Sequence, residues 1–332
     1  MIFSRHLMIQ DLSHIGEARR LGTYFCHDIG LEENQIATVA LIITELATNL
    51  IKHTNDLGGE LIFRQVIEDG AIGIDILALD RGPGIAHIGK ALEGGQSTSG
   101  SYGSGIPAII RRSSLFDIFS KQGAGTAIFC RLWKTGTAPI TNKLALGSVC
   151  LPIHGEKECG DAWAVKAGLE SRLIMVADGL GHGPDAAAAS NLAVSIFLNG
   201  HSQKPIELMQ LIHAGLSKTR GAAVAIAEIK LDTREIRYVG VGNITGQIFS
   251  GDESHFMVSH NGTAGVEAQK IVEFSYPYPL GALLVLYSDG LATHWKLADY
   301  PGLALKHPAL IAGVLFRDHR RPKDDSTVVV AR

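Results

Sequence analysis

The sequence predicts a two-domain α/β protein, and three observations lead to this prediction. The chain has 332 residues, which is enough for two domains of ordinary size. Hydrophobic residues make up 46% and charged residues 19%, so sizeable cores can be buried and disorder is not expected. Helix-like and strand-like segments occur on both sides of residues 135–145, where a stretch rich in Thr, Pro and Gly predicts a linker.

Charge and cysteine usage exclude several classes of protein. The formal net charge of −3 gives no reason to expect nucleic acid or a membrane as partner, and no apolar run reaches the roughly 18 residues of a membrane helix. Cys26, Cys130, Cys150 and Cys159 lack the CxxC spacing of a zinc site. We therefore expect a cytoplasmic protein with reduced thiols. The one basic cluster, 317-RDHRRPK-323, predicts a solvated turn or the flank of an acidic or phosphorylated site.

The first domain, residues 1–134, is predicted from periodicity. Residues 33–53 carry apolar side chains at helical spacing, and two strand-like runs, 60–68 and 71–80, are joined by the hairpin signal Asp69-Gly70. A glycine-rich tract and a helix-like segment at 106–114 follow, and two further short strands surround 121-KQGAGT-126.

Polar and glycine residues in this domain gather in patterns that suit a nucleotide. Glu45, Asn49 and His53 share one face of the long helix, which is either a solvated stripe or a site. In 80-DRGPGI-85 a carboxylate ends a strand, and bare backbone follows it. Glycines in 100-GSYGSGIPAII-110 precede a helix whose free N–H groups can bind phosphate.

The order of these motifs resembles the ATP-binding boxes of the GHKL (Bergerat) ATPase and kinase fold, an α/β sandwich. The four matching segments are 45-ELATNLIKH-53, 80-DRGPGI-85, 100-GSYGSG-105 and 123-GAGT-126. Residues 91–133 are more specifically similar to the RsbT type of serine kinase, which phosphorylates a small STAS-domain protein in bacterial partner switching. No second region resembles the phosphoacceptor-histidine helices of sensor kinases. The lid sequence GSYGSG departs from the commoner GxGLG, which implies weaker ATP binding.

The resemblance implies a role for each matching residue. Glu45 would be the general base that takes the proton of the attacking serine hydroxyl, and Asn49 would bind the Mg²⁺ of ATP. Asp80 would accept from the adenine amino group, with Thr126 nearby. The remaining ATP contacts would come from Gly82 and Gly84 under the nucleotide and from Gly103 and Gly105 in the phosphate lid.

The second domain, residues 146–332, is predicted as strand pairs interrupted by two helices. The expected strands are 162–168, 171–178, 223–230, 235–242, 282–289 and 326–332, and the expected helices are about 184–199 and 205–219. Four aspartates lie at predicted strand edges: Asp161, Asp178, Asp289 and Asp324. If these edges converge, the carboxylates form a site that is costly without metal ions, and all-oxygen ligation suits Mg²⁺ or Mn²⁺.

The same ordered set resembles the PPM metal-dependent protein phosphatases, specifically the SpoIIE and RsbX branch, whose fold is an α/β/β/α sandwich. By this resemblance Asp178 and the Gly179 carbonyl would bridge two Mg²⁺ or Mn²⁺ ions. Asp161, Asp289 and Asp324 would complete the shells, largely through water, and the water between the ions would attack a phosphoserine. The pattern favours Asp324 over Asp325. His182 is either a catalytic acid or, as the sequence favours, a residue that structures the loop.

Both motif sets together predict a bifunctional switch enzyme. It would use ATP to phosphorylate serine or threonine on a STAS-domain partner and also remove the phosphate, within a sigma-factor pathway. Two alternatives stay open. One is a module that sequesters a regulator and forms a complex that survives Glu45→Ala; the other is a phosphatase whose first half only senses nucleotide.

Overall fold

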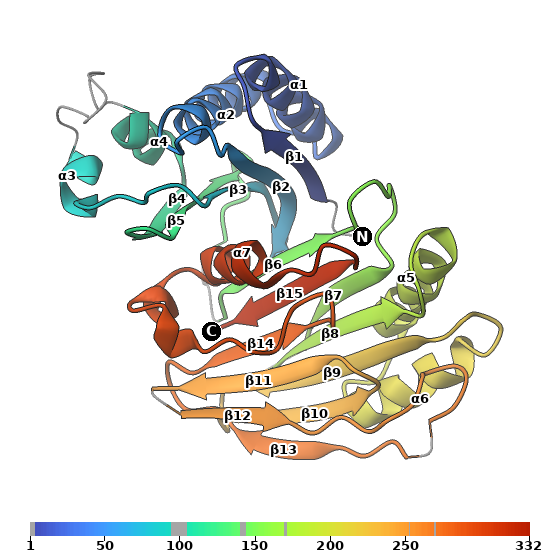
Figure 1. The fold of residues 1–332 in the computed structure, drawn as a ribbon. Coiled ribbons are helices and arrows are strands. Elements are labelled where there is room, and N and C mark those ends of the chain that lie inside the picture. The colour runs from blue at the N-terminus through green and yellow to red at the C-terminus, as the bar shows by residue number, and fades with distance from the viewer. Residues whose placement is uncertain (1–3, 94–104, 140–143, 169–170, 252, 269) are drawn as a thin grey trace. The chain divides into compact units, whose positions relative to one another are not determined.

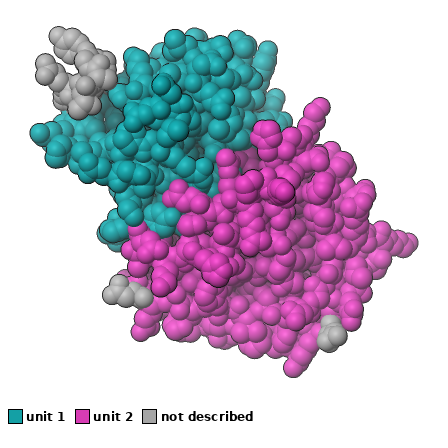
Figure 2. Space-filling model, in the orientation of Figure 1, with its two compact units in different colours: residues 1–143, 300–317 teal, residues 144–299, 318–332 magenta. Residues whose placement is uncertain are grey.

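The computed structural model describes residues 4–93, 105–139, 144–168, 171–251, 253–268 and 270–332. The chain forms two compact units (Figure 2). Unit 1 comprises Met1–Lys143 and Tyr300–Arg317, and unit 2 comprises Leu144–Asp299 and Asp318–Arg332. Tyr300–Arg317 therefore packs with the first unit, although it lies within the range 146–332 that the sequence pattern assigns to the second domain.

Unit 1 is built on one antiparallel five-stranded sheet in the order β1-β2-β3-β5-β4 (Figure 1). Its strands are β1 Ser4–Ile9, β2 Gly59–Glu68, β3 Ala71–Asp80, β4 Leu115–Lys121 and β5 Gly125–Trp133. The hairpin between β2 and β3 is present as predicted. Asp69 and Gly70 both have positive φ (48° and 83°), as a two-residue turn matching the twist of the strands requires.

Helices cover one face of this sheet. They are α1 Ser13–Asp28, α2 Glu33–Lys52, α3 Ile88–Glu93 and α4 Gly105–Arg112. The long helix α2 begins with a capping box between Glu32 and Gln35 and buries one apolar face that includes Val39, Ile43 and Leu46. By length and composition α2 is long and apolar enough to cross a membrane. Its buried residues belong to the core of unit 1, which explains the apolar composition.

A helix from the C-terminal part of the sequence, α7 (Pro308–His319), also belongs largely to unit 1. At its beginning the His307 ring stacks on Phe129, with ring centroids 4.4 Å apart. The Asp117 carboxylate accepts from the His307 backbone N–H at 2.7 Å and from Lys306 Nζ at 3.0 Å. Gly313 lies in the middle of the helix, where a Cβ would be 3.2 Å from the Leu77 and Leu79 side chains of β3.

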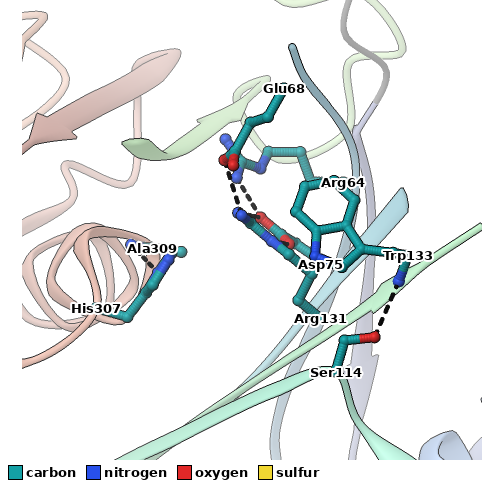
Figure 3. Close-up of polar contacts among 8 residues, drawn as sticks. All are labelled: Arg64, Glu68, Asp75, Ser114, Arg131, Trp133, His307 and Ala309. Carbon is teal, nitrogen blue, oxygen red and sulfur yellow. Dashed lines mark hydrogen bonds and ion pairs between the residues drawn. The ribbon is translucent and has the colours of Figure 1, made fainter. Parts of the chain in front are cut away.

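A buried cluster of charges spans β2, β3 and β5 (Figure 3). The Asp75 carboxylate binds the guanidinium groups of Arg64 and Arg131, and Arg131 also donates to Glu68 Oε1 at 2.7 Å. Burial alone would raise the pKa of Asp75, but the two arginines outweigh it and hold this pKa at about 2. Trp133 lies against Arg131, with 4.9 Å between Cζ and the ring centroid. The carboxylate is therefore ionised and fully paired.

Replacing Asp75 with alanine should destabilise unit 1 strongly. The substitution leaves two guanidinium groups buried without their shared partner, which costs about 3–5 kcal/mol. Urea unfolding measures the change in the free energy of unfolding. Glu17→Ala, an exposed site on α1, should stay within about 0.5 kcal/mol of the wild type. A loss below about 1 kcal/mol for Asp75→Ala would mean that solvent reaches the cluster.

Unit 2 contains two antiparallel five-stranded sheets, in the orders β13-β10-β9-β8-β7 and β12-β11-β14-β15-β6. The first consists of β7 Asp161–Ala167, β8 Ser171–Gly179, β9 Ala222–Lys230, β10 Glu235–Val241 and β13 Phe274–Pro277. The second consists of β6 Leu146–Leu151, β11 Thr245–Ser250, β12 Glu253–Met257, β14 Leu283–Tyr287 and β15 Ser326–Ala331. Two short 3-10 helices precede α7: Leu297–Asp299 lies in unit 2 and Leu303–Leu305 in unit 1.

Two helices, α5 (Pro184–Asn199) and α6 (Pro205–Gly215), pack on the first of these sheets. The alanine run at the start of α5 lets this helix approach β7 and β8 closely, because Ala186, Ala187 and Ala189 are buried. The four cysteines are free thiols, and the Sγ atoms of Cys150 and Cys159 lie 3.8 Å apart.

Candidate functional sites

The first candidate site lies at the C-terminal half of α2. Glu45 and Asn49 are half-buried and share one helical face. The first residue of α4, Gly105, lies opposite them: a Cβ here would be 3.0 Å from Glu45 Oε2 and 3.8 Å from Asn49 Oδ1. The structure therefore brings together a carboxylate, an amide and a helix N-terminus, which are separate in the sequence.

Asp80 ends β3 beside this group. Its Oδ1 accepts from the backbone N–H of Gly82 at 2.8 Å and of Thr126 at 3.1 Å. Burial raises the pKa of Asp80, and these two donors oppose the shift. Within the described residues no hydrogen bond ends on Oδ2, so this oxygen remains available to an amino group. Burial also lowers the pKa of His53, at the end of α2.

The glycines around Asp80 allow close approach of backbone. Gly84 has φ +73°, and a Cβ there would lie 2.4 Å from the Lys121 carbonyl oxygen. A Cβ on Gly82 would lie 2.8 Å from Thr54 Cα. Thr126 is 7% exposed and shares a 2.9 Å hydrogen bond with Ser120. The predicted lid residue Gly103 lies outside the described residues.

Together, these carboxylate, amide and backbone groups fit a purine nucleotide with a metal-bound phosphate chain. A fixed carboxylate oxygen suits an exocyclic amino group, and bare backbone suits a flat base. An amide oxygen beside a helix N-terminus suits Mg²⁺ and phosphate.

The second candidate site forms at one edge of the two sheets of unit 2. Asp161, at the start of β7, pairs directly with Asp178, at the end of β8. Asp289 follows the end of β14, and Asp324 precedes β15, its antiparallel neighbour. Because the end of one antiparallel strand lies beside the start of the next, all four carboxylates lie at strand edges that can converge.

The electrostatics show that the carboxylates do converge. Burial, followed by the nearby Asp161, Asp289 and Asp324, raises the pKa of Asp178 to about 9. Burial is also the main cause that raises the pKa of Asp161 to about 7. Such a cluster can ionise at neutral pH only if cations compensate it, and oxygen donors suit Mg²⁺ or Mn²⁺. The donor set therefore fits divalent cations.

In the described part of the chain, no three His, Cys, Asp or Glu side chains are close enough to hold one ion directly. Gly179 follows Asp178 and packs tightly, because a Cβ would lie 2.0 Å from the Ala186 carbonyl oxygen. Its N–H donates to the Gly160 carbonyl at 3.0 Å. This arrangement suits ions that keep several water ligands.

Asp324 and Asp325 have different surroundings. Asp325 is 3% exposed, and its carboxylate accepts from the backbone N–H groups of Ile153 at 2.8 Å and Gly160 at 3.0 Å. Asp324 instead lines the pocket of this site. Asp325 is thus committed to the loop before β7, whereas Asp324 faces the place where ions and substrate would bind.

The pocket has a volume of about 470 Å³. It is lined by Asp178, Leu180, Gly181, His182, Ala223, Gly242, Asn243, Asn261, Gly262, Thr263, Asp289 and Asp324. The side chain of His182 is 64% exposed, and its Nδ1 lies 3.4 Å from Glu156 Oε1. It can therefore reach either solvent or a bound substrate.

Two polar residues at this site were not predicted from the sequence. Asn243 Nδ2 donates to Asp289 Oδ2 at 2.7 Å, and Ser288 Oγ donates to Asp161 Oδ2 at 2.6 Å. Each orients a carboxylate of the cluster, as outer-shell partners of metal ligands do. Asn243 lies directly after Gly242 at the end of a strand, a signal too common to identify a site.

The metal-free protein should become less stable as the pH rises from 7 to 9. The folded-state pKa of Asp178, about 9, exceeds that of an unfolded aspartate, so in this range the folded state binds a proton that the unfolded state lacks. Stability therefore falls with rising pH, and we expect the Tm in EDTA to drop by about 2 °C or more. Thermal denaturation measures this change. Asp178→Asn should abolish the drop, and an equal drop in that variant would assign it to other groups.

Known proteins resemble both halves of the chain. Residues 170–332 match the family of Stage II sporulation protein E (SpoIIE). The serine/threonine-protein kinase RsbT of Bacillus subtilis (strain 168) is 36% identical over 116 residues, which is 35% of this chain and 86% of RsbT. The phosphoserine phosphatase RsbX of the same organism is 27% identical over 140 residues, or 42% of this chain and 70% of RsbX.

Two solved structures support the fold. A crystal structure of RsbX in complex with magnesium has a TM-score of 0.50 at 24% identity and covers 58% of this chain and 96% of that one. A chain from work on the bacterial stressosome as a modular system that controls secondary messenger signalling has a TM-score of 0.54 at 29% identity. It covers 57% of this chain and 100% of its own.

The sheet topology and these likenesses give an RsbT-like α/β region followed by a PPM-like sandwich, which confirms the predicted fold class. Through its N-terminal region the chain belongs to the RsbT family of serine/threonine-protein kinases. Its C-terminal region resembles the SpoIIE/PPM phosphatase domains, RsbX among them.

Proposed function

We propose that this chain is a bifunctional switch enzyme. It transfers phosphate from ATP to a serine or threonine of a STAS-domain partner and hydrolyses phosphoserine or phosphothreonine. The observation that carries the proposal is that one chain contains two sets of candidate site residues, Glu45 with Asn49 and Asp80 in unit 1 and the carboxylate cluster in unit 2. RsbT is named as a kinase and RsbX as a phosphatase, which supports opposite reactions within partner-switching stress signalling.

In the kinase reaction Asp80 orients the adenine ring of ATP. Glu45 accepts the proton of the attacking hydroxyl group. Asp80 can orient the ring because its backbone donors fix one carboxylate oxygen and leave the other for the adenine amino group. Glu45 is half-buried beside the start of α4, where Gly105 brings free N–H groups near the phosphates. Asn49 would hold the Mg²⁺ of ATP, and Gly82, Gly84, Gly103 and Thr126 would complete the nucleotide contacts.

In the phosphatase reaction the carboxylates position the attacking water. Two Mg²⁺ or Mn²⁺ ions would be held by Asp178 and the Gly179 carbonyl, together with Asp161, Asp289 and Asp324. Such ions supply an acidified water and neutralise phosphate charge. Asn243 and Ser288 keep two of the carboxylates in place. We further propose domain limits in the sequence of 1–134 and 146–332, joined by 135–145, with Tyr300–Arg317 packing with unit 1. We also propose a cytoplasmic location, where ATP is available.

The test uses the purified full-length chain, a candidate STAS-domain protein, radiolabelled ATP and Mg²⁺ or Mn²⁺. Label on a serine or threonine of the partner should first rise and then fall as ATP is exhausted. Absence of both transfer and release would contradict the proposal. A stable stoichiometric complex without labelling would favour sequestration instead.

A further inference from the structure

Arg317 begins the basic cluster 317-RDHRRPK-323, for which the sequence predicts either a solvated turn or the flank of an acidic or phosphorylated site. The structure shows that Arg317 itself is not solvated. The side chain is 2% exposed and is among the largest fully buried side chains of the described residues. It lies in the last part of α7 and belongs to unit 1. Burying a guanidinium group costs free energy unless hydrogen-bond acceptors surround it. The acceptors of Arg317 therefore bear on its function.

Arg317 exchanges hydrogen bonds with the residues that end β3. Its Nη1 donates to the Asp80 carbonyl oxygen at 2.9 Å, and the Arg81 guanidinium donates to the Arg317 carbonyl oxygen. The second bond satisfies a carbonyl group in the last turn of α7, where intrahelical donors run out and positive charge is favourable. The end of α7 and the Asp80–Arg81 segment are therefore fixed to each other from both sides.

Gly125 also restricts the position of the Asp80 carbonyl group. Gly125 packs so tightly against it that a Cβ would lie 2.0 Å from its oxygen. The carboxylate of the same residue accepts from Gly82 and Thr126. Because the Arg317 guanidinium also lowers the pKa of Asp80 against the effect of burial, its charge acts on the carboxylate as well as on the backbone.

We propose that Arg317 is a positioning residue of the nucleotide site. It holds the Asp80 peptide so that the free carboxylate oxygen faces the adenine amino group. This inference rests on the nucleotide-binding function proposed above for Asp80. It also means that ATP binding depends on a helix encoded in the phosphatase half of the sequence, with only residues 318–323 between Arg317 and Asp324.

The first test is kinetic and uses the full-length chain. Arg317→Met keeps much of the side-chain volume and removes the donors and the charge. We expect the KM for ATP to rise about tenfold, as for a lost charge-assisted hydrogen bond, while kcat at saturating ATP changes less than about threefold. Lys306→Met is the matched control, because it removes the ion pair with Asp117 at the other end of α7. Its KM for ATP should stay within about twofold of the wild type.

The second test needs no substitution at Arg317. Coupling between two sites is reciprocal, so ATP binding should stabilise the last turn of α7. Hydrogen exchange of the wild-type amides at 317–319 should slow on addition of ATP and Mg²⁺. In Asp80→Asn the same addition should produce a smaller effect. This result remains interpretable if Arg317→Met does not fold.

The outcomes separate this inference from the proposed function. If the wild type does not bind ATP, or Asp80→Asn binds as well as the wild type, the nucleotide-site assignment fails. If the wild type binds ATP and Asp80→Asn weakens binding, two results overturn the role of Arg317. These are an unchanged KM for ATP in a folded Arg317→Met and unchanged exchange at 317–319 in the wild type.

Discussion

Asp178→Asn should abolish phosphate hydrolysis and leave phosphate transfer intact. Burial, followed by the nearby Asp161, Asp289 and Asp324, raises the pKa of Asp178, and the asparagine removes one negative charge from the proposed ion site. Loss of an outer-shell partner commonly costs 10–100-fold in metal affinity or activity, so loss of the direct ligand proposed here should cost at least about 100-fold. Unit 1 keeps its own donors, and labelled partner should therefore accumulate.

Two measurements check this result. The first is release of phosphate from the isolated phosphorylated partner at fixed Mn²⁺, and the second is the increase in Tm that Mn²⁺ produces. Both should be lost in Asp178→Asn and retained in Asp232→Asn, an exposed aspartate in the turn between β9 and β10. Hydrolysis at the wild-type rate in Asp178→Asn would remove Asp178 from the ion site. A Tm response without hydrolysis would restrict its role to the chemical step.

The sequence predicts an element well when one of its sides is apolar and the other polar. Helix α2 has this pattern, and the hairpin β2–β3 is instead marked by its turn residues Asp69-Gly70. Both lie within a residue or so of the predicted limits. Helix α7 does not have this pattern, because every residue from Pro308 to Arg317 is buried and a helix without a polar face has no helical period to detect. For the same reason nothing in the basic run after Phe316 indicates that Arg317 is buried.

The candidate sites likewise have features that the sequence shows and features that only the folded structure shows. An aspartate at a strand edge is visible in the sequence, and four of them in order suggested one site. What a carboxylate contacts is not visible: Asp325 accepts from Gly160 and Ile153, which are distant in the chain. Asn243 and Ser288 were missed because an amide or hydroxyl gains meaning only once folding brings it against a particular carboxylate.

Glu45→Gln should abolish phosphate transfer and leave hydrolysis unchanged. The amide has nearly the same shape as the carboxylate but cannot accept the proton of the attacking hydroxyl, and loss of a general base costs about 10²–10⁴-fold in rate. ATP binding should persist, because the Asp80 contacts with Gly82 and Thr126 do not involve Glu45. The expected result is therefore a lower kcat at nearly constant KM for ATP.

Glu33→Gln is the matched control. Glu33 is exposed in the first turn of the same helix, whereas Glu45 lies in its C-terminal half. Labelling of the partner should proceed in this variant and stop in Glu45→Gln. If Glu45→Gln still labels the partner at the wild-type rate, another group takes the proton. If neither the wild type nor Glu33→Gln labels any partner while hydrolysis continues, unit 1 senses nucleotide without transferring phosphate. Only loss of labelling in Glu45→Gln combined with accumulation in Asp178→Asn makes the two units opposing enzymes on one substrate.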